Sequence, residues 1–126
     1  MKTFSRFSLI FFLICLVTLP LAAQSEGDTV KRVRFARGRT TAVYKGSARV
    51  GQEVYYILGA RRGQIMSVHL ASADKHAGFQ LYPIKGQMLA DGANDWKGEL
   101  PETNDYMIVV STSSRLATFT LEITIR

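Results

Sequence analysis

The sequence predicts a single-domain, all-β protein, an antiparallel β-sandwich of about seven or eight strands. Three observations predict this fold. Apolar and polar side chains alternate with a period of two along most of the chain, as they do in strands with one buried face and one wet face. Turn signals rich in Gly, Pro, Asn and Asp separate these segments at regular intervals. No segment carries apolar residues at helical spacing.

The N-terminal segment has the order of features typical of a signal peptide. Lys2 and Arg6 form a basic region, and an almost wholly apolar run, residues 9–23, follows it. This run is shorter than the roughly 20 residues that a bilayer crossing requires. We therefore expect cleavage between Ala23 and Gln24, no stable membrane span, and a periplasmic or secreted protein. The alternative is an uncleaved N-terminal anchor.

The remaining chain has the size of one domain. Removal of residues 1–23 from the 126 leaves 103, enough for a hydrophobic core. We expect a flexible leader at residues 24–30 and the β-sandwich at residues 31–126. The only cysteine, Cys15, leaves with the signal peptide, which excludes disulfides and thiolate sites from the mature chain. Fourteen basic residues then stand against ten acidic ones, too small a bias to predict a nucleic-acid partner.

The alternation assigns side chains to the inside and the outside of the sandwich. Val68 and Leu121 are expected to point into the core, and Ser67, His69 and Glu122 toward solvent. The other residues expected to point inward are Val33, Phe35, Tyr56, Leu58, Ala60, Met66, Leu70, Ala77, Phe79, Leu81, Tyr106, Ile108, Val110, Ala117, Phe119, Ile123 and Ile125. A brief strand is expected around Trp96, within an otherwise loop-rich segment.

The chain lacks recognisable catalytic and metal-binding motifs. No serine lies in a G-x-S-x-G sequence, and His69 and His76 are expected on different elements, so we expect no enzymatic activity. Asp91, Asn94 and Asp95 carry oxygen ligands suited to Ca²⁺, but their spacing does not match an EF-hand loop. Turns are the simpler interpretation of these residues. We therefore expect no cofactor and no metal.

The order of strands and turns resembles a group of small secreted bacterial β-sandwich domains. The similar stretches are AVYKGSARVGQEVYYILGARRGQIMSVHLAS, GELPETNDYMIVV and ATFTLEITI. The resemblance is carried by the turn at Gly63 and Gln64, and by Leu100, Pro101 and Tyr106 before the next strand. The group includes the periplasmic inhibitors of g-type lysozyme and, more distantly, the pre-peptidase C-terminal domains of secreted proteases. The resemblance covers nearly the whole mature chain.

The resemblance to the inhibitors implies a partner, a lysozyme-type glycosidase, whose substrate cleft is blocked by an inserted loop. The nearest match to such a loop is the segment STSSRLA, where Ser113, Ser114 and Arg115 form a contact group. This loop is short and contains a single arginine. A solvated hairpin tip is the alternative interpretation. Loops around His76 or Trp96 are further candidates if they share one end of the sandwich.

A second function remains open at this stage, a structural or carbohydrate-binding module of the cell envelope. Arg32 and Arg34 alternate with apolar neighbours and are expected to form a basic stripe on the sheet exterior. Such a stripe suits peptidoglycan or another anionic envelope polymer, or it protects an edge strand from aggregation. Trp96 is expected either to stack on a sugar ring or to plug the end of the sandwich.

Export provides the first test. Because the basic, apolar and small-residue regions occur in the required order, the exported protein should begin at Gln24, within one or two residues. Intact-mass analysis of protein recovered outside the cytoplasm measures this. Recovery of the chain in the membrane fraction with Met1 retained would contradict a cleaved signal peptide.

Overall fold

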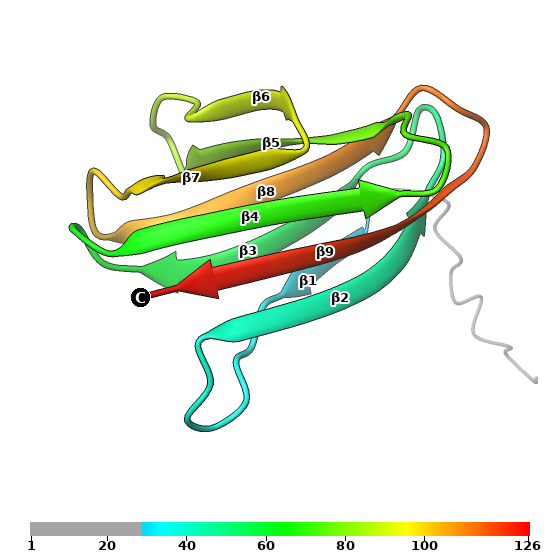
Figure 1. Cartoon of the computed structure of the whole chain (residues 1–126). Coiled ribbons are helices and arrows are strands. Elements are labelled where there is room, and N and C mark those ends of the chain that lie inside the picture. The colour runs from blue at the N-terminus through cyan, green and yellow to red at the C-terminus, as the bar shows by residue number, and fades with distance from the viewer. Residues whose placement is uncertain (1–28) are drawn as a thin grey trace, which may run out of the picture.

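The computed structural model describes residues 29–126, and the elements of this part of the chain are nine strands (Figure 1). They are β1 (Thr29–Arg32), β2 (Thr41–Ala48), β3 (Val54–Ala60), β4 (Ile65–Ser72), β5 (Ala77–Pro83), β6 (Ala90–Ala93), β7 (Asp95–Glu99), β8 (Asn104–Thr112) and β9 (Ala117–Ile125). The expected signal peptide and most of the expected leader lie outside the described residues. Within residues 29–126, the structure has no helix of the length and apolarity that a bilayer crossing needs.

The strands form two sheets that pack face to face, as Figure 1 shows. The order in the five-stranded sheet is β1-β3-β8-β5-β6, and the order in the four-stranded sheet is β2-β9-β4-β7. Neighbouring strands are antiparallel in every pairing except that of β1 with β3, which is parallel. The predicted all-β sandwich is confirmed, with nine strands in place of seven or eight.

The N-terminal strand differs from the expectation. β1 begins at Thr29, inside the segment expected to be leader, and ends at Arg32. Val33 adds one further bond to this pairing, since its N–H donates to the carbonyl of Ile57 at 2.9 Å. The chain then crosses to the other sheet through a turn at Gly38, whose φ of 75° favours glycine. Arg34 therefore lies in this crossing and not on a strand.

The core lies between the two inner faces. The predicted inward residues are buried there, apart from Phe35 and Ile125, which are partly buried against its margin. Gly46 makes room for one of the aromatic residues, because a Cβ at this position would lie 2.9 Å from the ring of Phe119. That ring packs edge-on against Tyr56, with 6.5 Å between the ring centroids. The period of two was thus a correct guide to the buried face.

Tyr106 anchors the loop that joins β7 to β8. Its ring is fully buried, and its hydroxyl donates to the carbonyl of Glu102 at 2.5 Å. The N–H of Glu102 donates back to the same hydroxyl at 3.3 Å. This corner and the turn at Gly63, where φ is 91°, are the structural signals on which the sequence resemblance depends.

Core packing provides the second test. Leu121 is fully buried on the central strand β9, so Leu121→Ala should lower the free energy of unfolding by about 2 to 5 kcal/mol. Thr118→Ala, on the exposed face of the same strand, should change it by no more than about 0.5 kcal/mol. Urea titration followed by circular dichroism measures both. Equal losses in the two variants would contradict the assignment of faces.

Candidate functional site

Three loops meet at one end of the sandwich, on the right in Figure 1, and we call this region the loop end. They are the β2–β3 loop (residues 49–53), the β4–β5 loop (73–76) and the β8–β9 loop (113–116). Hydrogen bonds join them: the N–H of Val50 donates to the carbonyl of Ser114 at 3.0 Å, and the hydroxyl of Ser114 donates to Asp74 at 2.8 Å. Residues distant in the sequence thus form one surface.

Asp74 holds two of these loops in place. Its Oδ1 accepts the backbone N–H of His76 at 3.0 Å, and its Oδ2 accepts the hydroxyl of Ser114. These bonds, first from the His76 N–H and then from the Ser114 hydroxyl, lower the pKa of the Asp74 carboxyl below its ordinary value. Lys75, which lies between Asp74 and His76 in the sequence, has a φ of 61°, in the left-handed region that ordinary residues seldom adopt. The carboxylate therefore supports a strained turn.

Thr112 supports the β8–β9 loop from below. It is the buried polar residue at the end of β8, and its Oγ1 accepts the N–H of Ser114 at 3.1 Å. The same oxygen lies 3.0 Å from the hydroxyl of Ser114 and 3.3 Å from the carbonyl of His76. Ser113 donates its N–H to that carbonyl at 3.4 Å. The loop is consequently a hydrogen-bonded structure that presents its tip in a defined position.

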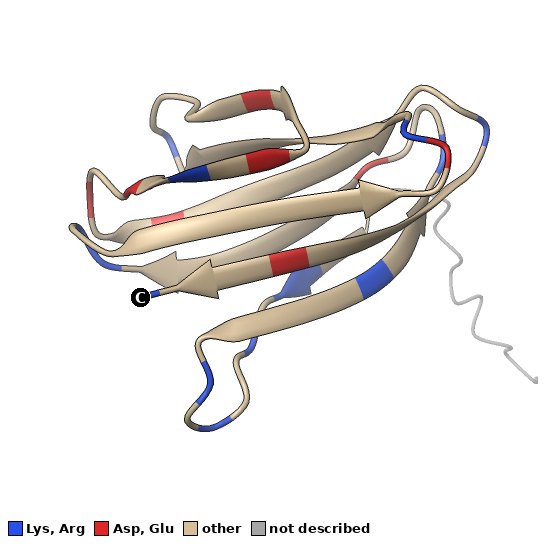
Figure 2. Ribbon diagram, viewed as in Figure 1, with Lys and Arg blue, Asp and Glu red and all other residues tan. Residues whose placement is uncertain are grey.

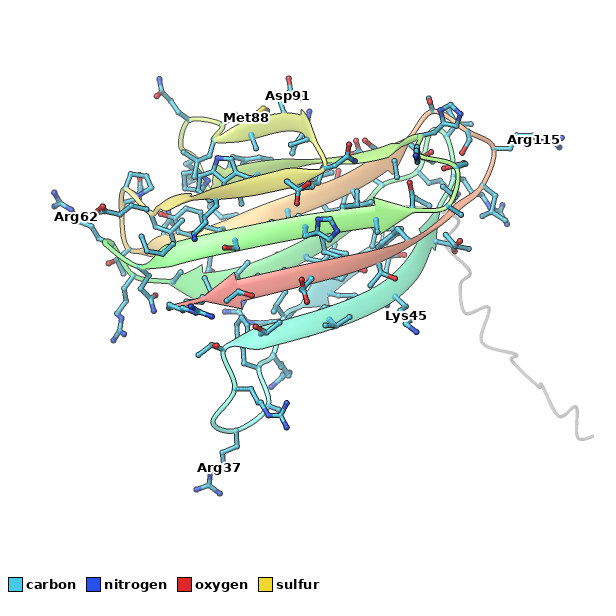
Figure 3. The ribbon with its side chains drawn as sticks, viewed as in Figure 1. Arg37, Lys45, Arg62, Met88, Asp91 and Arg115 are labelled. Carbon is cyan, nitrogen blue, oxygen red and sulfur yellow. The ribbon has the colours of Figure 1, made fainter. Side chains whose placement is uncertain are left out.

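The surface of the loop end combines cations with exposed apolar side chains. Arg49, Lys75 and Arg115 are exposed, one on each loop, and Figure 2 shows basic residues at this end of both sheets. Arg115 points away from the molecule (Figure 3). Val50 and Leu116 are 56% and 55% exposed. Such a mixture is typical of protein-binding surfaces, whose apolar centre is bordered by charge.

The structure places the candidate residues of the inhibitor hypothesis as follows. Ser113, Ser114, Arg115 and His76 lie together at the loop end, while Trp96 lies apart on β7. Val50 and Leu116 are not among the residues expected from the sequence. The available signal was the pairing of an arginine with an apolar residue, Arg49 with Val50 and Arg115 with Leu116.

Trp96 packs inward at the margin of the core. It lies opposite Val68 on the neighbouring strand and is partly buried against the core cluster. Its ring also covers Gly98, where a Cβ would lie 2.7 Å from the indole. The ring therefore lies at the open edge of the four-stranded sheet, on β7, and not at an end of the sandwich.

The two arginines of the expected basic stripe belong to different elements. Arg32 ends β1 and forms an ion pair with Asp105 at 3.6 Å, in which both side chains are about half exposed. Arg34 lies in the loop after β1, and its backbone N–H donates to the hydroxyl of Tyr44 at 2.8 Å. The regular alternation of Arg and apolar residues therefore does not produce a continuous strand with one basic face.

The three residues considered as Ca²⁺ ligands make separate contacts. Asp91 accepts the side-chain amide of Gln80 at 3.1 Å, and Asn94 donates to the carbonyl of Ala77 at 2.8 Å. Asp95 pairs with His69, with 2.5 Å between Oδ1 and Nδ1. Across residues 29–126, no three His, Cys, Asp or Glu side chains gather closely enough to hold a metal ion.

Solved structures with a similar fold include periplasmic inhibitors of g-type lysozyme, called PliG. The inhibitor from Aeromonas hydrophila matches with a TM-score of 0.71 at 26% sequence identity, over 79% of this chain and 98% of the inhibitor. The chain resembles PliG in three dimensions. PliG from Salmonella Typhimurium gives a TM-score of 0.60 at 21% identity, over 78% of this chain and 98% of the inhibitor.

The second group named in the sequence resemblance also appears among the structural neighbours. The pre-peptidase C-terminal domain of a Bacillus anthracis collagenase matches with a TM-score of 0.56 at 12% identity, over 82% of this chain and 100% of that domain. The resemblance inferred from the sequence is thus confirmed, and the similarity is greater to PliG. No protein-family profile matches the chain, and no curated protein sequence matches it.

The carboxylate of Asp74 provides the third test. Because hydrogen bonding lowers its pKa in the folded protein, its contribution to loop order is fully present above the unfolded value of 3.8 and is lost as the pH falls through the lower folded value. An NMR titration should show the His76 amide proton shifting with a midpoint below 3.8. Asp74→Asn should speed hydrogen exchange of the His76 amide several-fold at neutral pH.

Asp91→Asn is the matched control for this test, because Asp91 lies on β6 and bonds Gln80 instead of the loop end. It should leave the His76 amide unchanged. A His76 titration midpoint at or above 3.8 would contradict the role assigned to Asp74.

Proposed function

We propose that this protein is a non-enzymatic inhibitor of a g-type lysozyme and acts by inserting the loop end, with Arg115 at its tip, into the substrate cleft. The observation that carries the proposal is the similarity to the Aeromonas hydrophila PliG, which extends over 98% of that inhibitor. The PliG neighbours are periplasmic proteins, and the N-terminal sequence predicts that this chain is exported as well.

The chemistry of the loop end suits a glycosidase cleft. Glycosidases in general place carboxyl groups around the bond that they cleave, and a guanidinium forms short, charge-assisted hydrogen bonds with carboxylates. Arg115 is exposed at the end of a loop that is held by Thr112 and Asp74. Since the loop is ordered before binding, less conformational entropy is lost when the complex forms.

The apolar residues beside Arg115 supply the second part of the contact. Val50 and Leu116 lie on loops that are joined by the hydrogen bond from the N–H of Val50 to the carbonyl of Ser114. Burial of both side chains against the rim of the cleft would exclude water from the arginine, which strengthens its electrostatic interactions. The apolar contacts of the three-loop surface thereby add to the binding energy that a short loop with a single arginine can supply.

The envelope-polymer alternative has less support from the geometry. Trp96 is partly buried against the core, and Arg32 is paired with Asp105. Two of the three residues on which that alternative depends thus have partners within the fold, and Arg34 lies apart from them in the loop after β1.

Inhibition provides the fourth test. The protein should reduce the lysis of peptidoglycan by a g-type lysozyme, and Arg115→Ala should weaken the complex by about 2 to 5 kcal/mol, mostly through faster dissociation. Arg62→Ala is the matched control, because Arg62 lies at the opposite end of the sandwich (Figure 3). It should leave the affinity unchanged. Surface plasmon resonance measures both rates, and lysis assays measure the inhibition.

Two outcomes of this test would count against the proposal. Absence of inhibition of the g-type lysozyme at micromolar protein would contradict the proposed function. A c-type lysozyme, assayed in parallel, is the specificity control. Inhibition that survives both Arg115→Ala and the double change Val50→Ser with Leu116→Ser would contradict the assignment of the loop end.

A further inference from the structure

The two sheets leave four edge strands, β1, β6, β2 and β7, and three of them carry features that discourage pairing with another chain. β1 and β6 have only four residues each, and the pairing of β6 with β5 is irregular. β7 has five residues and carries the charged side chains Asp95, Lys97 and Glu99. Short length, irregularity and charge are the usual protections of exposed sheet edges.

β2 lacks these protections. It is eight residues long and pairs with β9 in an unbroken register along its whole length. Its sequence, TAVYKGSA, contains one charged residue, Lys45, and no proline. Val43 is 54% exposed. A long, regular and weakly charged edge strand presents unpaired backbone groups to any strand that can lie beside it.

The hydrogen bonds of β9 show which residues of β2 face its free edge. The N–H of Ile125 donates to the carbonyl of Thr40 at 2.9 Å, and antiparallel ladders alternate between bonded and non-bonded pairs. Ala42, Tyr44, Gly46 and Ala48 therefore direct their N–H and C=O groups toward β9. The residues that direct both groups toward the free edge are Thr41, Val43, Lys45 and Ser47.

We propose that β2 pairs with β2 of a second copy of this chain, antiparallel about a two-fold axis that passes between the two Tyr44 residues. The four-stranded sheets of the two copies then form one continuous sheet. The inference is independent of lysozyme inhibition, because it depends only on the edge of the sheet.

Backbone parity and charge select this register. Residues of β2 that face the free edge must lie opposite residues that also face it in the second copy. One β2 can therefore slide along the other only in steps of two residues. With the axis at Tyr44, all four edge-facing residues find partners: Val43 opposes Lys45, and Thr41 opposes Ser47. A shift in one direction places Lys45 opposite Lys45, where like charges repel. A shift in the other direction moves Ser47 past the end of the strand.

The register also determines what lies beyond the paired strands. Four facing pairs exchange roughly eight backbone hydrogen bonds, two for each pair. The two Tyr44 residues face each other at the axis, and each ring stays packed against Tyr56 of its own copy, with 5.3 Å between the ring centroids. The β1–β2 loop, with Arg37 at its tip, lies below the start of β2 on the side away from β9 (Figure 3). This loop of one copy therefore lies beside the end of β2 in the other, where Arg39 comes near Arg49. Salt should therefore strengthen the association by screening this repulsion. The two loop ends lie at opposite ends of the dimer.

Disulfide trapping tests the register directly. The only cysteine, Cys15, leaves with the expected signal peptide, so the variants Val43→Cys and Lys45→Cys are prepared directly in the exported protein. A bonded antiparallel pair has its Cα atoms about 5.5 Å apart, which suits a disulfide. A mixture of the two variants should cross-link in several-fold higher yield than either variant alone. Equal yields in all three samples would overturn the proposal.

Sedimentation equilibrium of the exported protein tests the association itself. Val43→Pro removes an N–H that faces the edge and should weaken the dimer by roughly tenfold or more, because each copy loses a pairing hydrogen bond. Lys97→Pro is the matched control: the bond from the N–H of Leu70 to the carbonyl of Asn94 places Lys97 on the opposite free edge. It should dimerise as the wild type does. A wild-type protein that stays monomeric up to near-millimolar concentration in high salt would overturn the proposal.

Discussion

Each sheet of this sandwich buries one face against the other, and this shared burial is the constraint on which the rest of the structure depends. β9 shows its strength, because five inward side chains, from Ala117 to Ile125, alternate with polar ones along a strand that pairs on both sides. A slip of one residue in either pairing would turn the apolar set toward water. Burial therefore sets the register of the central strands, and the register sets where each loop emerges.

The loop end depends on this register through a small number of polar contacts. Thr112 and Asp74 lie at or just beyond the ends of β8 and β4, where the ladder stops and backbone groups need other partners. Their oxygens accept N–H and O–H groups from Ser114 and His76. The tip with Arg115 is thus ordered by the ends of two strands that belong to different sheets.

The same regular alternation that builds the core leaves an open edge. Two packed sheets have edges that a closed barrel would lack. An edge strand can be short, irregular or charged only if the core does not need the full length of that strand. β2 contributes Ala42, Ala48 and the partly buried Tyr44 to the core and its margin, and an unbroken ladder to β9 is what places them there. Core packing and edge protection make opposing demands on this strand.

The sequence by itself determined the strand-rich class, the approximate strand positions and the inward face of residues such as Val68 and Leu121, because side-chain alternation is a local property of the chain. Tertiary structure decided where β1 begins and ends, since that strand exists through its parallel pairing with β3. It also decided that Trp96 packs inward opposite Val68. His76 and Ser114 meet at Asp74 because β4, β5, β8 and β9 bring their ends together, and such convergence depends on long-range pairing that no local pattern encodes.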